Sequence, residues 1–128
     1  MIANADLDSC DIAVEIVGIN TTGQIVNMNG QGLPGVCGIK LDDDSNAYLQ
    51  ATNIHLSMYT TNGIRVGRGC HALLSNIWID EWNKSGSGFP GVEASDPTAR
   101  VYLGKPFFFG QGHGGREWGG IGGFDVDA

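Results

Sequence analysis

The densest acidic groups in this 128-residue chain are Asp42-Asp43-Asp44 and Asp80-Glu81. Cleavage of a glycosidic bond needs two carboxylates, one of them held protonated, separated by ~5 to ~9.5 Å according to the stereochemical outcome. Asp42, Asp43 and Asp80 are therefore the candidate catalytic residues. The competing interpretation is that residues 42–44 form a solvated turn after a strand, with at most a weak cation site.

Basic residues near these acids favour a second reaction class. A polysaccharide lyase needs a base beside a carboxylate that calcium or Arg neutralises. Arg65, Arg68 and Lys40 would then face an acidic sugar. Asp42 or Asp43 would hold calcium through oxygen ligands. Beyond this weak calcium possibility we expect no cofactor and assign no metal site, because the histidines are too scattered to bind zinc.

Aromatic residues offer a route to binding that requires no catalysis. Flat rings along a groove are good platforms for sugar rings. The candidate substrate-binding residues are Trp78, Trp82, His55, Arg65 and Arg68.

Trp78 is predicted to point away from the core. It lies between Ile77 and Ile79, and side chains alternate between the two faces of a strand. Its neighbours on adjacent strands are predicted to be His55 and Phe108. An exposed strip of this kind requires a cover. A glycan or another subunit would supply it, and we favour the subunit.

Strands must position these residues, because no apolar stripe of helical period runs for three turns. A short phrase, an outward charge between two inward apolar side chains, recurs at intervals of 25, 25 and 28 residues. Its copies are Val14-Glu15-Ile16, Ile39-Lys40-Leu41, Ile64-Arg65-Val66 and Val92-Glu93-Ala94. A strand-sized phrase at a fixed interval predicts a solenoid of strands, with one interior ladder through Val14, Ile39, Ile64, Val92 and Ile121.

A second class of strand alternates with the first. Its members are the segments 24–28, 53–56, 76–79 and 107–109, and a third short strand is predicted around 47–50 and 70–74. The sequence thus predicts an all-β solenoid of about 4–5 coils of ~25 residues over positions 10–110. The whole chain, 1–128, is predicted to be one domain, with a Gly-rich cap or tail over 111–128.

The rung phrases resemble a known family. Gly-Ile-Lys-Leu-Asp-Asp-Asp-Ser-Asn-Ala from Gly38, Asn-Gly-Ile-Arg-Val-Gly from Asn62 and Leu-Ser-Asn-Ile-Trp-Ile from Leu74 are similar to rungs of the right-handed parallel β-helix of the pectate-lyase-like superfamily. That superfamily includes polygalacturonases, lyases and phage tailspikes. The resemblance is one of rung style, and the Asn-x-Asp, His-Gly and Arg-x-Lys motifs of polygalacturonases are missing from the sequence.

Two functions are consistent with this resemblance. The first is a β-helix module of a carbohydrate-active protein, related to glycoside hydrolases or polysaccharide lyases and acting on a polysaccharide. The alternative is a non-catalytic structural or adhesive module, such as a phage tail-fibre or surface-protein segment, that forms a homotrimer. The resemblance implies a secreted protein or one on a virion or cell surface.

Composition and charge bear on which classes of partner the chain could bind. The net charge is −7 with only seven Lys and Arg, so the basic footprint of a nucleic-acid-binding protein is missing. No apolar run approaches the ~20 residues of a membrane helix, and the N-terminal residues lack the pattern of a signal peptide. We therefore expect neither nucleic acid nor a membrane as partner. The three cysteines cannot all pair within one chain.

Overall fold

The computed structural model describes residues 1–109, 121–123 and 125–127, which contain strands and no helix. The strands follow one another in the order β1 (Ile2–Asp8), β2 (Ile12–Ile16), β3 (Thr22–Gly35), β4 (Cys37–Leu41), β5 (Tyr48–Tyr59), β6 (Ile64–Val66), β7 (His71–Asp80), β8 (Val92–Ala94), β9 (Arg100–Phe109), β10 (Ile121–Gly123) and β11 (Asp125–Asp127). Most of the predicted tail, 111–128, lies outside the described residues.

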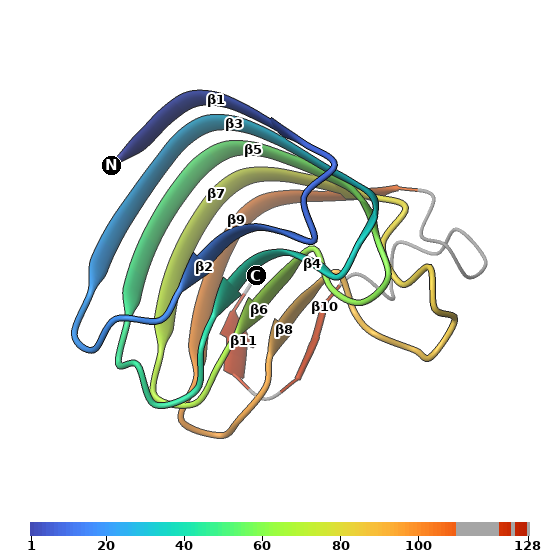
Figure 1. Ribbon diagram of the computed structural model, residues 1–128. Coiled ribbons are helices and arrows are strands. Elements are labelled where there is room, and N and C mark those ends of the chain that lie inside the picture. The colour runs from blue at the N-terminus through green and yellow to red at the C-terminus, as the bar shows by residue number, and fades with distance from the viewer. Residues whose placement is uncertain (110–120, 124, 128) are drawn as a thin grey trace.

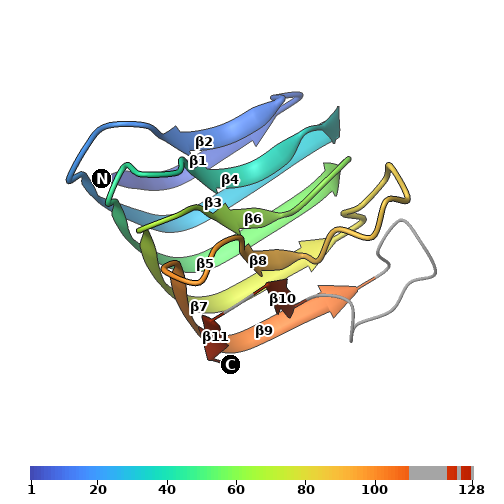
Figure 2. The same ribbon diagram turned by 90° about the horizontal axis from the view of Figure 1, so that it is seen from below.

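Two parallel sheets wind together into one solenoid (Figures 1 and 2). The long-strand sheet has the order β1-β3-β5-β7-β9-β11, and the short-strand sheet has the order β10-β8-β6-β4-β2. Because long and short strands alternate along the chain, every turn of the solenoid adds one strand to each sheet. The result is a β-solenoid of about four turns, as the repeat predicts, and β1 extends the stack upstream of the predicted first coil.

The repeated phrase forms the short-strand sheet. Val14 pairs with Ile39, Ile39 with Ile64, and Ile64 with Val92, and Ile121 continues the ladder. Ile39, Ile64 and Val92 have no exposed surface. The predicted interior ladder is therefore confirmed, and its burial supplies much of the hydrophobic stabilisation of the stack.

The long strands bend at a ladder of asparagines. Asn4, Asn27, Asn53 and Asn76 all have positive φ, between 54° and 57°. Asparagine tolerates this left-handed conformation better than most residues, so each long strand can turn there without a glycine. The side chains bond from coil to coil: each Nδ2 donates to the Oδ1 of the preceding asparagine at 2.7–2.9 Å.

The bend explains why the second and third predicted strands of each coil are one element. Segments 47–50 and 53–56 are predicted as separate strands, but β5 is one strand that contains both except Ala47 and bends at Asn53. β7 likewise contains the predicted segments 70–74 and 76–79 except Cys70, and it bends at Asn76. We call the four residues Asn4, Asn27, Asn53 and Asn76 the amide ladder.

One predicted register is wrong. Trp78 pairs with Phe107, and Phe108 pairs with Ile79 and is 6% exposed. The loop after Trp82 lengthens this coil, so the offset from Trp78 to its partner is 29 residues instead of the 23 between His55 and Trp78. A slip of one residue moves a side chain to the opposite face of a sheet, which is why Phe108 enters the core.

All three cysteines are free: Cys37 and Cys70 are buried, and Cys10 is half-buried. Burial raises the pKa of the Cys37 thiol to about 12. The two buried cysteines are small residues of the core, and Cys70 Sγ also donates to the Asp42 carbonyl in the turn after β4. Among the described residues, no helix is long and apolar enough to cross a membrane.

Candidate functional site

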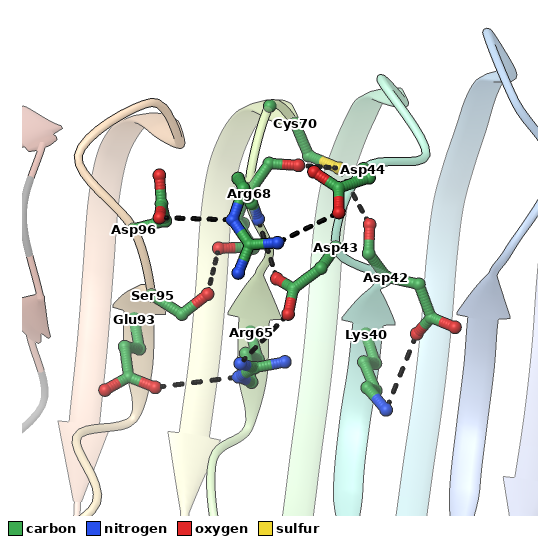
Figure 3. Close-up of polar contacts among 12 residues, drawn as sticks. Lys40, Asp42, Asp43, Asp44, Arg65, Arg68, Cys70, Glu93, Ser95 and Asp96 are labelled. Atoms are coloured by element: carbon green, nitrogen blue, oxygen red, sulfur yellow. Dashed lines mark hydrogen bonds and ion pairs between the residues drawn. The ribbon is translucent and has the colours of Figure 1, made fainter.

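The candidate residues separate into two groups on different parts of the coil. The first group lies at the corner where β4 turns into β5 and β6 turns into β7 (Figure 3). We call it the corner network, and its charged members are Lys40, Asp42, Asp43, Asp44, Arg65, Arg68, Glu93 and Asp96.

Asp43 closes one turn onto the next. Its Oδ1 accepts a 2.8 Å hydrogen bond from the backbone N–H of Arg68, and its Oδ2 lies 4.0 Å from Arg65 Nη2. Arg65 Nε is in turn 3.9 Å from Glu93 Oε1. The outward residues of the repeated phrase therefore continue their charge pairing into the turn.

Arg68 lies between two acids from neighbouring coils. Its Nη1 donates to Asp44 Oδ2 at 2.9 Å, and its Nε donates to Asp96 Oδ2 at 3.4 Å. The carboxylate of Asp44 raises the pKa of the Arg68 guanidinium. Hydrogen bonds from the backbone and hydroxyl of Thr98 lower the pKa of Asp96. Both groups stay charged at neutral pH and hold each other.

Asp42 has a basic neighbour as well. Lys40 Nζ lies 3.5 Å from Asp42 Oδ1. This oxygen is buried, and no donor among the described residues has the distance and angles of a hydrogen bond to it. We regard the contact as an ion pair, because a 3.5 Å separation between full charges is attractive even without hydrogen-bond alignment. Behind it, Ser45 Oγ and Cys70 Sγ donate to the Asp42 carbonyl at 2.8 and 3.2 Å.

The structure does not bring Asp80 to the other candidate acids. Asp80 ends the ten-residue strand β7, whose other end lies next to the corner. Its hydrogen-bond partners are His55 and Trp78, whereas Asp42 and Asp43 contact Lys40, Arg65 and Arg68, so these acids belong to separate networks. Among the described residues, no group of three or more His, Cys, Asp or Glu side chains could hold a metal ion.

The second group lies on the outer face of the long-strand sheet, the face turned away from the core. Asp80 Oδ2 accepts hydrogen bonds of 3.0 Å from Trp78 Nε1 and from His55 Nε2. Because a carboxylate only accepts, His55 donates this bond from Nε2. Asp80 thus orients two predicted binding residues from neighbouring strands.

Aromatic rings continue from this group toward the C-terminal coil. His55 and Trp78 have ring centroids 5.5 Å apart, Trp78 and Phe107 4.8 Å, and Phe107 and Phe109 6.4 Å. Trp78 is 46% exposed, so its predicted outward orientation is confirmed. We call His55, Trp78 and Phe107 the aromatic strip.

Trp82, the other predicted platform, lies in the core. It is 1% exposed, its Nε1 donates to the Phe89 carbonyl at 3.0 Å, and its ring contacts Phe108 edge-on. Its role is to anchor the enlarged loop after β7. Asn83 Oδ1 supports the same loop by accepting from the N–H groups of Gly88 and Phe89.

Two concavities lie on the outer face, one at the amide ladder itself and one beside it, along the strand segments that precede the ladder. One, of about 430 Å³, is lined by Asn27, Asn29, Asn53, His55, Asn76 and Trp78. The other, of about 270 Å³, is lined by Gln24, Val26, Gln50, Thr52, Leu73 and Ser75. The sequence matches Asn53 with Asn76 at an offset of 23, but the continuous row of amides was missed, because the offsets along it vary with the coil length.

Comparison of the chain with protein-family models, with curated proteins and with solved structures found no match. The geometry of the two groups therefore carries the functional argument.

Proposed function

We propose that this solenoid is a carbohydrate-binding module whose binding site is the outer face of the long-strand sheet. The observation that carries the proposal is the 430 Å³ concavity, where side-chain amides of the amide ladder lie beside the half-exposed indole of Trp78. Carbohydrate recognition combines a flat apolar surface for the ring with donors and acceptors for its hydroxyls. One surface supplies both here.

The amides have hydrogen-bonding capacity left for a ligand. An asparagine side chain has two N–H donors and two acceptor lone pairs, and each internal member of the amide ladder uses one donor and one acceptor on its neighbours. The ladder also fixes the orientation of these amides, so little conformational entropy is lost when they bind.

The orientation of Trp78 supports the same proposal. Asp80 holds its Nε1, and the rings of His55 and Phe107 contact it from both neighbouring strands. A fixed indole with a half-exposed face is a better stacking platform than a mobile one, because its rotamer is already selected.

The proposed function does not include catalysis by the candidate acids. Asp42 and Asp43 have Lys40, Arg65 and Arg68 as charge partners, and Asp80 bonds to His55 and Trp78. In this proposal the corner acids stabilise turns. Asp42→Asn, Asp43→Asn and Asp80→Asn variants, assayed for release of reducing ends or of unsaturated uronate, test the catalytic alternative. If the wild type releases either product and any of the three variants does not, the result would favour the catalytic alternative.

The binding test uses a glycan array followed by calorimetric titration of the best ligand. Trp78→Ala should weaken binding at least ~10-fold, since losing an aromatic contact of ~1.5 kcal/mol corresponds to about that factor. Tyr48→Ala is the matched control, because Tyr48 is an exposed aromatic of the same sheet outside both concavities. Equal affinities for Trp78→Ala and the wild type, or an array without a ligand, would contradict the proposal.

A second candidate is the structural or adhesive module in which subunits, such as those of a homotrimer, cover the outer face. The exposed apolar side chains of β7 and β9 favour it, and they are Leu73, Trp78, Tyr102, Phe107 and Phe109, each 42–57% exposed. Multi-angle light scattering would then give a trimer that Phe107→Ser dissociates. A glycan-binding monomer would eliminate this candidate.

A further inference from the structure

The two concavities of the outer face form one continuous path. We call the 270 Å³ hollow, which contains Gln50, the glutamine concavity, and the 430 Å³ hollow, which contains Trp78, the ladder concavity. On β5 the lining of the glutamine concavity ends at Thr52, and the lining of the ladder concavity begins at the next residue, Asn53. β3 and β7 divide in the same way, each at its own asparagine of the amide ladder. The path therefore crosses the amide ladder along the direction of the strands.

The glutamine concavity offers the same kinds of group as the ladder concavity. Gln24 Nε2 donates to Gln50 Oε1 at 3.1 Å, which holds the two amides together, and no acceptor among the described residues takes the N–H groups of Gln50. Thr52 Oγ1 donates to the Ser75 carbonyl at 3.2 Å and keeps its lone pairs as acceptors. Leu73, in the same lining, is 42% exposed and supplies an apolar surface. Both concavities thus combine donors, acceptors and an exposed apolar side chain.

The path is longer than one sugar ring. Gln50 lines its first part and His55 its last part, five residues further along β5. The contour between them is ~17 Å at ~3.3 Å per residue, and even with the bend at Asn53 a single ring covers only a fraction of it. Trp78 is the strand partner of His55, so it lies at the same end. A ligand that stacks on Trp78 and also reaches Gln50 must therefore consist of linked rings.

Charged side chains are missing from the lining of this path. The described residues that line the two concavities include no Asp, Glu, Lys or Arg. Carboxylates border the ladder concavity: Asp6 Oδ1 accepts from Asn29 Nδ2 at 2.9 Å, and Asp80 accepts from His55 and Trp78. An anionic sugar would face these carboxylates, and like charges repel.

The basic residues predicted to face an acidic sugar lie elsewhere. Lys40, Arg65 and Arg68 belong to the corner network, where carboxylates pair with them. On the outer face, Lys105 occupies the position of β9 that continues the amide ladder, and it lines neither concavity. The net charge of −7 also opposes the approach of a polyanion.

We infer that the outer face binds an uncharged oligosaccharide whose rings run along the strands through both concavities. This inference rests on the proposed function and specifies its ligand class. One ring stacks on Trp78, and the following rings bond to the amide ladder and to Gln50. Since the lining groups are neutral donors, acceptors and apolar surfaces, hydrogen bonds and stacking supply the affinity. Added NaCl should leave this affinity unchanged, because salt screens only attraction between charges.

Affinity electrophoresis tests the charge of the ligand. Gels with hydroxyethyl cellulose, galactomannan or dextran supply neutral polysaccharides, and gels with polygalacturonate or alginate supply anionic ones. We expect at least one neutral polysaccharide to retard the protein, equally with and without added NaCl, and neither polyanion to do so. Lys105→Gln should leave the retardation unchanged. Retardation by the polyanions alone, or its loss in Lys105→Gln, would overturn the inference and leave the proposed function standing.

Calorimetric titration with oligosaccharides of increasing length, cut from the retarding polysaccharide, tests the path. Affinity should rise with the number of rings until the ligand covers both concavities. Gln50→Ala should reduce the affinity for the longest oligosaccharide about 2- to 10-fold, the effect of losing one hydrogen bond, and so reduce the gain with length. Trp78→Ala should weaken binding at every length. Gln31→Ala is the matched control, because Gln31 is an amide on the outer face of β3 that lines neither concavity.

The outcomes separate this inference from the proposed function. Gln50 is exposed, so Gln50→Ala should keep the unfolding midpoint of the wild type. Equal affinities for short and long oligosaccharides, or equal losses in Gln50→Ala and Gln31→Ala, would overturn the path through both concavities while glycan binding stands. If no gel of either kind retards the protein, the inference fails. A glycan array without a ligand would show that the proposed function fails as well.

Discussion

The corner network and the outer face of the long-strand sheet use polar groups in opposite ways. At the corner, each charge of the β4 and β6 turns lies within 4.0 Å of an opposite charge from its own or a neighbouring coil. On the outer face, the amides keep free donors and acceptors, and Trp78 keeps about half its surface exposed. Polar groups that bond to one another stabilise the stack in both regions, and the donors and acceptors that remain unused on the outer face are available to a ligand. Three predictions test this contrast.

The largest effect should come from the amide ladder. Asn53→Ala removes the hydrogen bonds to Asn27 and Asn76, about 0.5–1.5 kcal/mol each, and places alanine at φ 56°, for about 1–2 kcal/mol. We expect the free energy of unfolding in urea to fall by about 2–5 kcal/mol. Asn53→Gly should cost less, because glycine adopts positive φ without strain. Equal free energies of unfolding for Asn53→Ala and the wild type would show that the amide ladder does not stabilise the fold.

A smaller effect should come from the buried part of the corner. Ser45 is 3% exposed, and its Oγ donates to the Asp42 carbonyl. Ser45→Ala should cost about 1 kcal/mol in chemical denaturation, because Cys70 Sγ still donates to that carbonyl. Thr21→Ala is the control, since Thr21 makes a similar 2.8 Å bond to the Gly18 carbonyl at the exposed surface. A larger loss for Thr21→Ala would reverse the expected order.

The smallest effect should come from the exposed ion pairs. Hydrogen bonds from Thr98 lower the pKa of Asp96, so its stabilising contribution is present above the unfolded pKa of ~3.9 and is lost as pH falls through the lower folded value. Asp96→Asn should therefore leave urea unfolding at pH 7 little changed, since exposed pairs contribute little. The difference from wild type should vanish in acid, once the pH is below the folded pKa of Asp96. A difference that grows with acidity would contradict this assignment.

The sequence predicts the interior ladders because their chemistry is local. An apolar-charged-apolar triplet predicts which side chains enter the core. Its recurrence at a near-constant interval predicts that the coils stack. The outward orientation of Trp78 follows from the same alternation, with Ile77 and Ile79 as inward neighbours. The charge pairs Glu15–Lys40 and Arg65–Glu93 also follow from the repeat.

Tertiary structure decided what depends on the length of each coil. The offset from Trp78 to its partner is 29 residues, so Phe107 lies outside and Phe108 inside, and the loop that lengthens the coil turns Trp82 into the core. The amide ladder likewise required the actual registers, since left-handed Asn residues carry no alternation signal. The sequence by itself determined the stack and its interior. Loop lengths decided which residues face one another across coils, because a one-residue slip exchanges the faces of a strand. They therefore also decided which surface keeps unused hydrogen-bond donors and acceptors, and only the folded chain reveals them.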